Sequence, residues 1–170
     1  MSAITIENIQ KASAQFWEQM LDMHLEPCNE TWTRPDQQRC IEANHLLAYC
    51  DLNGVWAGRI EVRLTLGLAR HATSAMLMQP LEAVEPADTL DATKEIANMI
   101  AGTLKSALPR PCSMSVPSAQ IEAGEFCVLP RTENIVTVFF HHAAGELMVR
   151  VRQRTFIGAL SQEPLAEMCA

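Results

Sequence analysis

Residues 56–66 read Trp56-Ala57-Gly58-Arg59-Ile60-Glu61-Val62-Arg63-Leu64-Thr65-Leu66, and this stretch carries the strongest signal for the fold. Every second residue from Trp56 onward is apolar or glycine, whereas the residues between them from Arg59 to Thr65 are polar or charged. Successive side chains of a β-strand point to opposite faces, so this period predicts a strand that buries only one face. Such half-buried strands are typical of antiparallel sheets.

The flanking residues predict what this strand connects. The preceding segment 41–51 is apolar with polar interruptions, and Asn53-Gly54 is a favoured dipeptide for a two-residue hairpin turn. After the strand, residues 66–79 change to helical spacing, which Pro80 ends. We therefore expect a β-hairpin that leads directly into a helix.

Two longer amphipathic helices are predicted elsewhere in the chain. The first covers residues 4–25, where apolar residues recur at near-helical spacing, and a polar loop follows over residues 26–39. Residues 80–86 form a connector before the second helix. That helix runs to about Leu108, with Asp88 and Thr89 as candidate N-caps and with Pro109 and Pro111 beyond its end.

The remainder of the chain returns to strand patterns. Residues 113–123 are one candidate strand, and residues 135–142 and 146–154 form a predicted hairpin around Gly145. Arg150, Arg152 and Arg154 share one face of its second strand, where we expect a solvated sheet edge, with contact to an acidic partner surface as the alternative. The order of elements indicates an α+β fold, in which an antiparallel sheet has two long helices packed on one face.

Length and composition indicate a single domain over residues 1–170, with an N-terminal helix and loop in residues 1–40 and a core in residues 41–154. The formal net charge is -7, and the sequence lacks the basic stripe that nucleic-acid binding requires. No apolar run approaches the roughly 20 residues of a membrane helix. The 6 dispersed cysteines are typical of free thiols in a reducing compartment. We therefore expect a cytoplasmic protein with neither nucleic acid nor membrane as a partner.

The most informative run for chemistry is Asp91-Ala92-Thr93-Lys94-Glu95-Ile96-Ala97-Asn98-Met99-Ile100-Ala101-Gly102, inside the second long helix. Glu95 and Asn98 are three residues apart, so a carboxylate and a carboxamide lie side by side, about 60° apart around the helix axis. Asp91, Gly102 and Lys105 fall on the same polar strip. The opposite side carries the residues that we expect to be buried, which are Ile96, Met99, Ile100, Leu104 and Leu108.

Each of these residues has a structural alternative to a functional role. A Glu–Asn pair on a helix is most often solvated surface, and Asp91 equally suits a cap near the helix start. Gly102 costs about 1 kcal/mol of helix stability relative to alanine. It would let another molecule approach the backbone, or it would pack closely against a neighbouring strand. No metal ligand set is predicted, because the histidines are scattered and the adjacent pair, His141 and His142, would point to opposite faces of a strand.

The run from Asp91 to Gly102 resembles the active-site helix of the CheC/CheX/FliY family of chemotaxis phosphatases. With its single copy of Glu-x-x-Asn-Met-Ile-Ala-Gly, the chain is most similar to CheX. The hairpin sequence from Asn53 to Gly58 and the hairpin at Gly145 also resemble the family, so the likeness extends from about Ile41 to Arg154. One departure concerns a proline that the family carries after the Asn, because the nearest counterpart here, Pro117, lies closer to the helix.

This resemblance implies an enzyme that hydrolyses the aspartyl phosphate of a CheY-type response-regulator receiver domain. Asn98 would orient the water, Glu95 would pair with a lysine of the receiver, and Asp91, Gly102 and Lys105 would contact that partner. The resemblance implies a homodimer and no cofactor or metal of this chain, because the receiver would hold Mg²⁺. Two alternatives stay open: a non-catalytic CheX-like module that docks on a receiver or signalling protein, and a structural protein of the flagellar-switch type.

Overall fold

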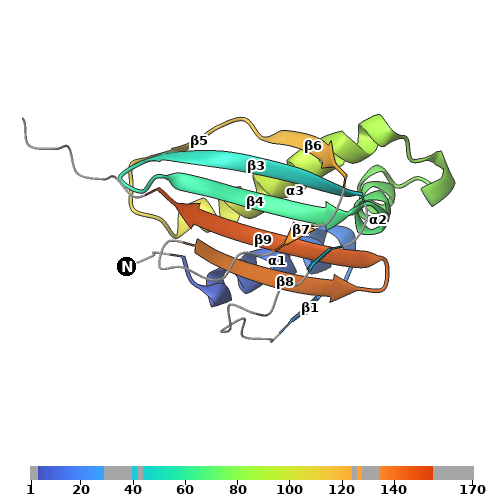
Figure 1. The fold of residues 1–170 in the computed structure, drawn as a ribbon, viewed down its shortest axis with the longest axis horizontal. Coiled ribbons are helices and arrows are strands. Elements are labelled where there is room, and N and C mark those ends of the chain that lie inside the picture. Colours follow the sequence, from blue (N-terminus) through green and yellow to red (C-terminus); the bar gives the residue numbers. More distant parts are fainter. Residues whose placement is uncertain (1–3, 29–39, 42–43, 124–125, 128–134, 155–170) are drawn as a thin grey trace, which may run out of the picture.

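A computed structural model describes residues 4–28, 40–41, 44–123, 126–127 and 135–154. The strands of its main sheet are β1 Glu26–Pro27, β3 His45–Gly54, β4 Gly58–Thr65, β5 Cys112–Met114, β6 Ser118–Glu122, β8 Ile135–His142 and β9 Gly145–Gln153. They follow the order β1-β8-β9-β4-β3-β5, with β6 also paired to β3, and each pairing is antiparallel (Figure 1). A separate antiparallel pair joins β2 Cys40–Ile41 to β7 Phe126–Cys127.

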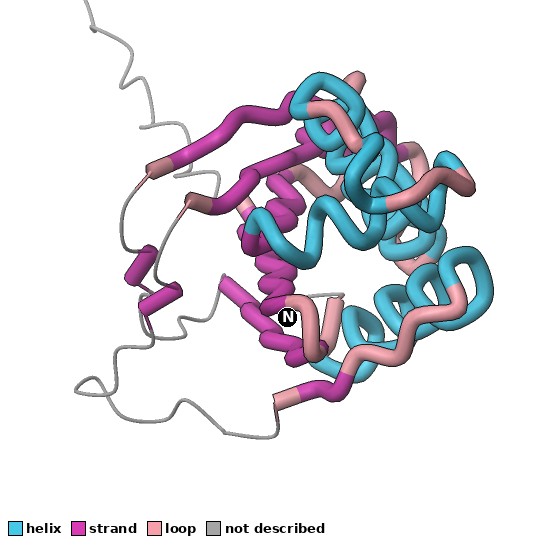
Figure 2. The backbone as a smooth tube through the Cα atoms, turned by 90° about the vertical axis from the view of Figure 1, so that its right-hand side faces the viewer, coloured by secondary structure: helices cyan, strands magenta, loops and turns pink. Residues whose placement is uncertain are grey.

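The helices of the described chain cover one face of the main sheet (Figure 2). They are α1 Ile6–Leu21, α2 Leu66–Leu77 and α3 Pro86–Ser106, with a short 3-10 helix, η1 Leu81–Ala83, between the last two. α3 packs against β3 and β4 and against both other α-helices, whereas α1 also contacts β8. The predicted α+β fold, with its long helices on one face of an antiparallel sheet, is therefore confirmed.

The hydrophobic core lies between this sheet face and the helices. Alternate residues of the two central strands supply one side of it, namely Ile60, Val62, Leu64, Leu147, Val149 and Val151. Trp17 of α1 and Ile96 and Ile100 of α3 supply the other side and are fully buried. A buried aliphatic side chain stabilises the fold by about 1.5–3 kcal/mol. Of the predicted buried stripe on α3, only Met99 differs, because it is partly rather than fully buried.

Both predicted hairpins form, but the first turns at a different place. Asn53 and Gly54 are the last residues of β3 and pair with Ser113 and Cys112 of β5, so the chain reverses over residues 55–57. Gly54 has a φ of 147°, and a Cβ there would lie 2.1 Å from the carbonyl oxygen of Pro111. Contact with a third strand therefore explains this glycine better than the two-residue turn that we predicted.

Three predicted boundaries are corrected by the structure. α3 begins at Pro86 after Glu85, so neither Asp88 nor Thr89 is its N-cap. Proline suits the first position of a helix, because its fixed φ is already helical. The single strand predicted over residues 113–123 is two strands, β5 and β6, separated by residues 115–117. Within the loop predicted over residues 26–39, Glu26–Pro27 forms β1, and residues 29–39 lie outside the described residues.

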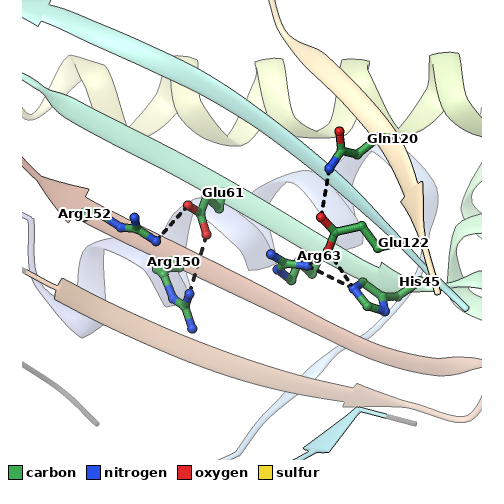
Figure 3. Close-up of polar contacts among 7 residues, drawn as sticks. All are labelled: His45, Glu61, Arg63, Gln120, Glu122, Arg150 and Arg152. Carbon is green, nitrogen blue, oxygen red and sulfur yellow. Dashed lines mark hydrogen bonds and ion pairs between the residues drawn. The ribbon is translucent and has the colours of Figure 1, made fainter. Parts of the chain in front are cut away.

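The sheet face opposite the helices is not the open polar surface that the alternation predicted. Glu61 and Arg63 of β4 and Arg150 of β9 point to this face and are buried. Figure 3 shows Glu61 between Arg150 and Arg152, and Arg63 beside His45 and Glu122. The prediction that Arg150, Arg152 and Arg154 line a solvated sheet edge is wrong about the edge, because β9 is an interior strand between β8 and β4. Arg152 and Arg154 are exposed as predicted, whereas Arg150 is buried.

Candidate functional site

The candidate site is built on α3, whose sequence suits a long helix. Pro86 occupies its first turn together with Asp88, and Lys105 lies in its last turn. An acid near the start and a cation near the end both complement the helix dipole. The helix closes where the Ala107 N–H donates to the carbonyls of Leu104 and Lys105. α3 therefore presents a regular surface on which residue spacing fixes the relative positions of side chains.

One side of α3 is buried against the core and the other faces outward. The buried side consists of Thr89, Ala92, Thr93, Ile96, Ala97, Ile100, Ala101 and Leu104. On the outward side, Asp91, Glu95 and Gly102 are exposed, whereas Asn98 and Lys105 are half-buried. The five residues predicted as catalytic or partner-binding therefore share one face of a single helix, and we call them the α3 strip. Its members can all be reached by another molecule.

The side chains of Glu95 and Asn98 make no hydrogen bond or ion pair with any residue that the structure describes. Asp91 differs, because its carboxylate lies 2.8 Å from the ammonium of Lys94. An exposed pair at this spacing contributes only about 0.2–0.5 kcal/mol, so it opens readily. The helix begins five residues before Asp91, which rules out the capping role for that residue. Because neither side chain of the central pair is engaged within the described chain, the Glu95 carboxylate and the Asn98 carboxamide are available to bind a partner.

Gly102 lies in the open part of the strip. A Cβ built at Gly102 would have no neighbouring atom within 4 Å. The alternative of close packing against a neighbouring strand is therefore wrong for this glycine. Because Gly102 has no side chain, the helix backbone is accessible one turn after Asn98.

A groove that the sequence did not predict lies at the C-terminal end of the strip. It has a volume of about 670 Å³ and is lined by Gly102, Lys105, Ser106, Arg110, Pro111 and Cys112. Only Gly102 and Lys105 were predicted site residues. Arg110 and Cys112 come from the turn after the helix and from β5, so helical spacing could not place them. The Pro109-Arg110-Pro111 sequence was a signal only for the end of the helix.

The remaining predictions about binding concern metal and membrane. Within the described ranges, no cluster of three or more His, Cys, Asp or Glu side chains could hold a metal ion. None of the helices in the described part of the chain is both long and apolar enough to cross a membrane. Pro117 lies between β5 and β6, which both pair with β3.

Comparison with known proteins identifies the family. A sequence model described as "Chemotaxis phosphatase CheX" matches residues 46–141, which is more than half of the chain and includes all of β3 except His45, the whole of β4 and the whole α3 strip. The chain belongs to the CheX family. Among the curated proteins, none matches the chain.

Solved structures of CheX proteins share the fold of this CheX-family chain. CheX from Vibrio vulnificus has a TM-score of 0.68 at 17% identity, over 88% of this chain and 98% of that one. CheX from Desulfovibrio desulfuricans has a TM-score of 0.65 at 22% identity, over 87% of this chain and 97% of that one. A CheX–CheY–BeF3–Mg complex from Borrelia burgdorferi has a TM-score of 0.63 at 15% identity, over 90% of this chain and 99% of that one.

Proposed function

We propose that this protein is a phosphatase that hydrolyses the aspartyl phosphate of a CheY-type receiver domain. One observation carries the proposal: in a chain of the CheX family, Glu95 and Asn98 lie on the outward face of α3, and their side chains make no hydrogen bond or ion pair with any described residue. The similar fold of a CheX protein that was solved in complex with CheY supports the choice of partner.

Asn98 is suited to position the attacking water. Its carboxamide is neutral and carries both an acceptor and donors, so it binds water without repelling a phosphoryl group. In the proposed step, Asn98 Oδ1 accepts a hydrogen bond from the water, whose oxygen attacks phosphorus in line with the leaving carboxylate oxygen. The P–O bond to the aspartate breaks, and the products are inorganic phosphate and a free carboxylate. Such chemistry depends mainly on positioning and on stabilising charge.

Glu95 serves a different purpose in this proposal. A carboxylate beside a phosphoryl group is unfavourable unless a cation lies between them or next to it. A lysine of the receiver supplies that cation by pairing with Glu95, which fixes Asn98 one turn along the helix against the phosphoryl group. Mg²⁺ is held by the receiver, and this chain supplies no cofactor. Asp91, Gly102 and Lys105 contact the receiver around this pair.

The experiment times the decay of phosphorylated receiver domains with wild-type protein, Asn98→Ala and Glu95→Ala. We expect Asn98→Ala to lower the accelerated rate by about 100-fold or more at saturating receiver, similar to the loss of a single stabilising group in other enzymes. Glu95→Ala should mainly raise KM. Thr103→Ala, at an exposed position of α3 outside the strip, is the matched control and should behave as wild type.

Two results would count against this mechanism. Equal acceleration by Asn98→Ala and wild type would remove the water-positioning role. Binding of receivers without acceleration of their decay by the wild-type protein would favour the non-catalytic module.

We also propose that the protein is a homodimer, as the family resemblance implies. Light scattering of the purified protein will test this proposal.

A further inference from the structure

The groove at the end of α3 is continuous with the α3 strip. Gly102 and Lys105 belong to both, and the groove extends from them to Arg110, Pro111 and Cys112. Lys105 is seven residues after Asn98, so its Cα is about 10 Å further along the helix axis. A partner that reaches Asn98 and is larger than a few residues therefore also covers this groove.

The groove is basic, although the chain as a whole carries a net charge of -7. Its lining includes Lys105 and Arg110 and no acidic residue. Neither of these two side chains has a hydrogen-bond or ion-pair partner among the residues that the structure describes. The helix dipole would account for a cation in the last turn. It does not account for Arg110, which lies beyond the capping residue Ala107.

The backbone on both sides of Arg110 is anchored. Before it, the Leu108 N–H donates to the Lys105 carbonyl at 3.0 Å. After it, the Pro111 carbonyl accepts a hydrogen bond of 3.0 Å from the Val55 N–H, and Cys112 pairs with Gly54. The turn that carries Arg110 is therefore held between α3 and β3. This keeps the Arg110 guanidinium near the groove and leaves its N–H groups available to a partner.

Charge changes sign along this surface. Glu95 supplies the negative charge at one end, where Asp91 is paired with Lys94. Asn98 and Gly102 are neutral, and Lys105 and Arg110 form a basic end. About 15 Å separates Glu95 from Lys105 along the helix axis. A partner with a cation opposite Glu95 and carboxylates opposite the groove fits in one direction only, because the reverse orientation would face like charges with each other.

We propose that the groove binds carboxylate side chains of the same receiver domain whose phosphoryl group faces Asn98. This inference rests on the proposed function and adds Arg110 to the docking surface. Lys105 and Arg110 act at a distance from the reacting phosphorus, so they stabilise ground state and transition state alike. Interactions of that kind change KM and leave kcat unaltered. Because the groove is open to solvent, salt should weaken its contribution.

The test compares Arg110→Glu and Lys105→Glu with Lys11→Glu, an exposed position on α1 that undergoes the same change of charge. Receiver domains from the source organism, phosphorylated by a small-molecule phosphodonor, are the varied substrate at 50 mM and 300 mM salt. The same receivers, activated with beryllofluoride and Mg²⁺, are titrated for binding. We expect each groove variant to raise KM and Kd about tenfold at the lower salt, and less at the higher salt, with kcat unchanged. Lys11→Glu should stay within about twofold of wild type.

The outcomes separate this inference from the proposed function. If Asn98→Ala abolishes activity and the groove variants match Lys11→Glu, the groove inference is wrong and the phosphatase proposal stands. If the wild type binds activated receivers without speeding their decay, and Arg110→Glu weakens that binding, the groove inference stands and the phosphatase proposal does not. A groove variant that lowers kcat at an unchanged KM contradicts the docking role. Absence of binding to every receiver overturns both.

Discussion

Arg150 of β9 lies directly opposite Glu61 of β4 in the antiparallel register, and its Nη1 atom is 3.6 Å from Glu61 Oε2 (Figure 3). Only 5% of the Arg150 side chain and 8% of the Glu61 side chain are exposed. Burial lowers the pKa of Arg150, and the charge of Glu61 opposes that effect. Arg152 adds a second contact to the same carboxylate at 3.1 Å. The Glu61 carboxylate of β4 thus compensates the charges of two arginines on the neighbouring strand β9.

Glu61→Gln should destabilise the fold substantially. The substitution leaves Arg150 buried beside a neutral group, and removal of one partner from a buried ion pair typically costs about 3–5 kcal/mol. We expect a loss near the lower value, because Arg150 also donates to Thr137. Urea denaturation measures the free energy of unfolding, with the exposed Glu82→Gln as control. A change as small as that of the control, within about 0.5 kcal/mol, would show that the pair is energetically neutral.

Gly102→Ala should stabilise the protein. The position lies inside α3, and the added Cβ has open space around it. Alanine is favoured over glycine in a helix interior by about 1 kcal/mol, so the midpoint of urea denaturation should rise. A decrease would show that the glycine has an unrecognised structural role.

A larger side chain at Gly102 should weaken binding of the receiver without affecting the fold. Gly102→Gln places a long side chain between Asn98 and the basic groove, and we expect a KM about tenfold higher, equivalent to about 1.4 kcal/mol of binding energy. Thr103→Gln adds a similar side chain at an exposed neighbouring position outside the strip. Equal KM values for the two variants would indicate that the partner does not approach Gly102.

Stability should fall in acid because two paired carboxylates must be protonated. A hydrogen bond from Arg59 holds the pKa of Asp51 below its usual value, despite partial burial. For Glu122, burial opposes ionisation, but hydrogen bonds from Arg63 and Gln120 outweigh it and also lower the pKa. A depressed pKa in the folded state stabilises the fold above the unfolded-state pKa of about 4, and this stabilisation is lost as pH falls further.

Urea denaturation at pH 7 and at successive values below pH 4.5 checks this prediction, with the free energy of unfolding expected to decline through that range. Asp51→Asn should make the decline shallower, because one of the two carboxylates then no longer titrates. An unchanged slope in this variant would show that Asp51 keeps its ordinary pKa in the folded protein.

Cys50 should be unreactive in the native protein. Burial, followed by the neighbouring charge of Asp51, raises the pKa of its thiol to about 11, so hardly any thiolate exists at pH 8. Cys28 and Cys112 are also free thiols but are partly exposed. Brief alkylation at pH 8 and peptide mass spectrometry should find label on Cys28 and Cys112, and on Cys50 only after unfolding. Early modification of Cys50 would contradict its placement in the core.

Several features of the fold could be predicted from local sequence. Alternation over residues 58–65 and the period of α3 both depend on how neighbouring side chains are arranged along one element, so they are visible without tertiary structure. The outward position of Glu95 and Asn98 follows from the same geometry. The predicted N-cap of α3 is wrong because residues 80–86 resemble a connector. Pro86 belongs to the helix instead, since proline is favourable as the first residue of a helix.

Other features depend on which elements become neighbours. The alternating pattern of β9 is the same for an edge strand and for an interior one, so only the strand order shows that Arg150 is buried against Glu61. The basic groove likewise combines the last turn of α3 with Arg110 and Cys112, which a turn and a β-strand bring to it. Sequence by itself determined the two hairpins, the helices and the face of α3 that carries the pair, but not the short strand β1 or the division between β5 and β6. Tertiary structure alone decided strand order, the burial of charges on the second sheet face and the groove, because long-range packing sets all three.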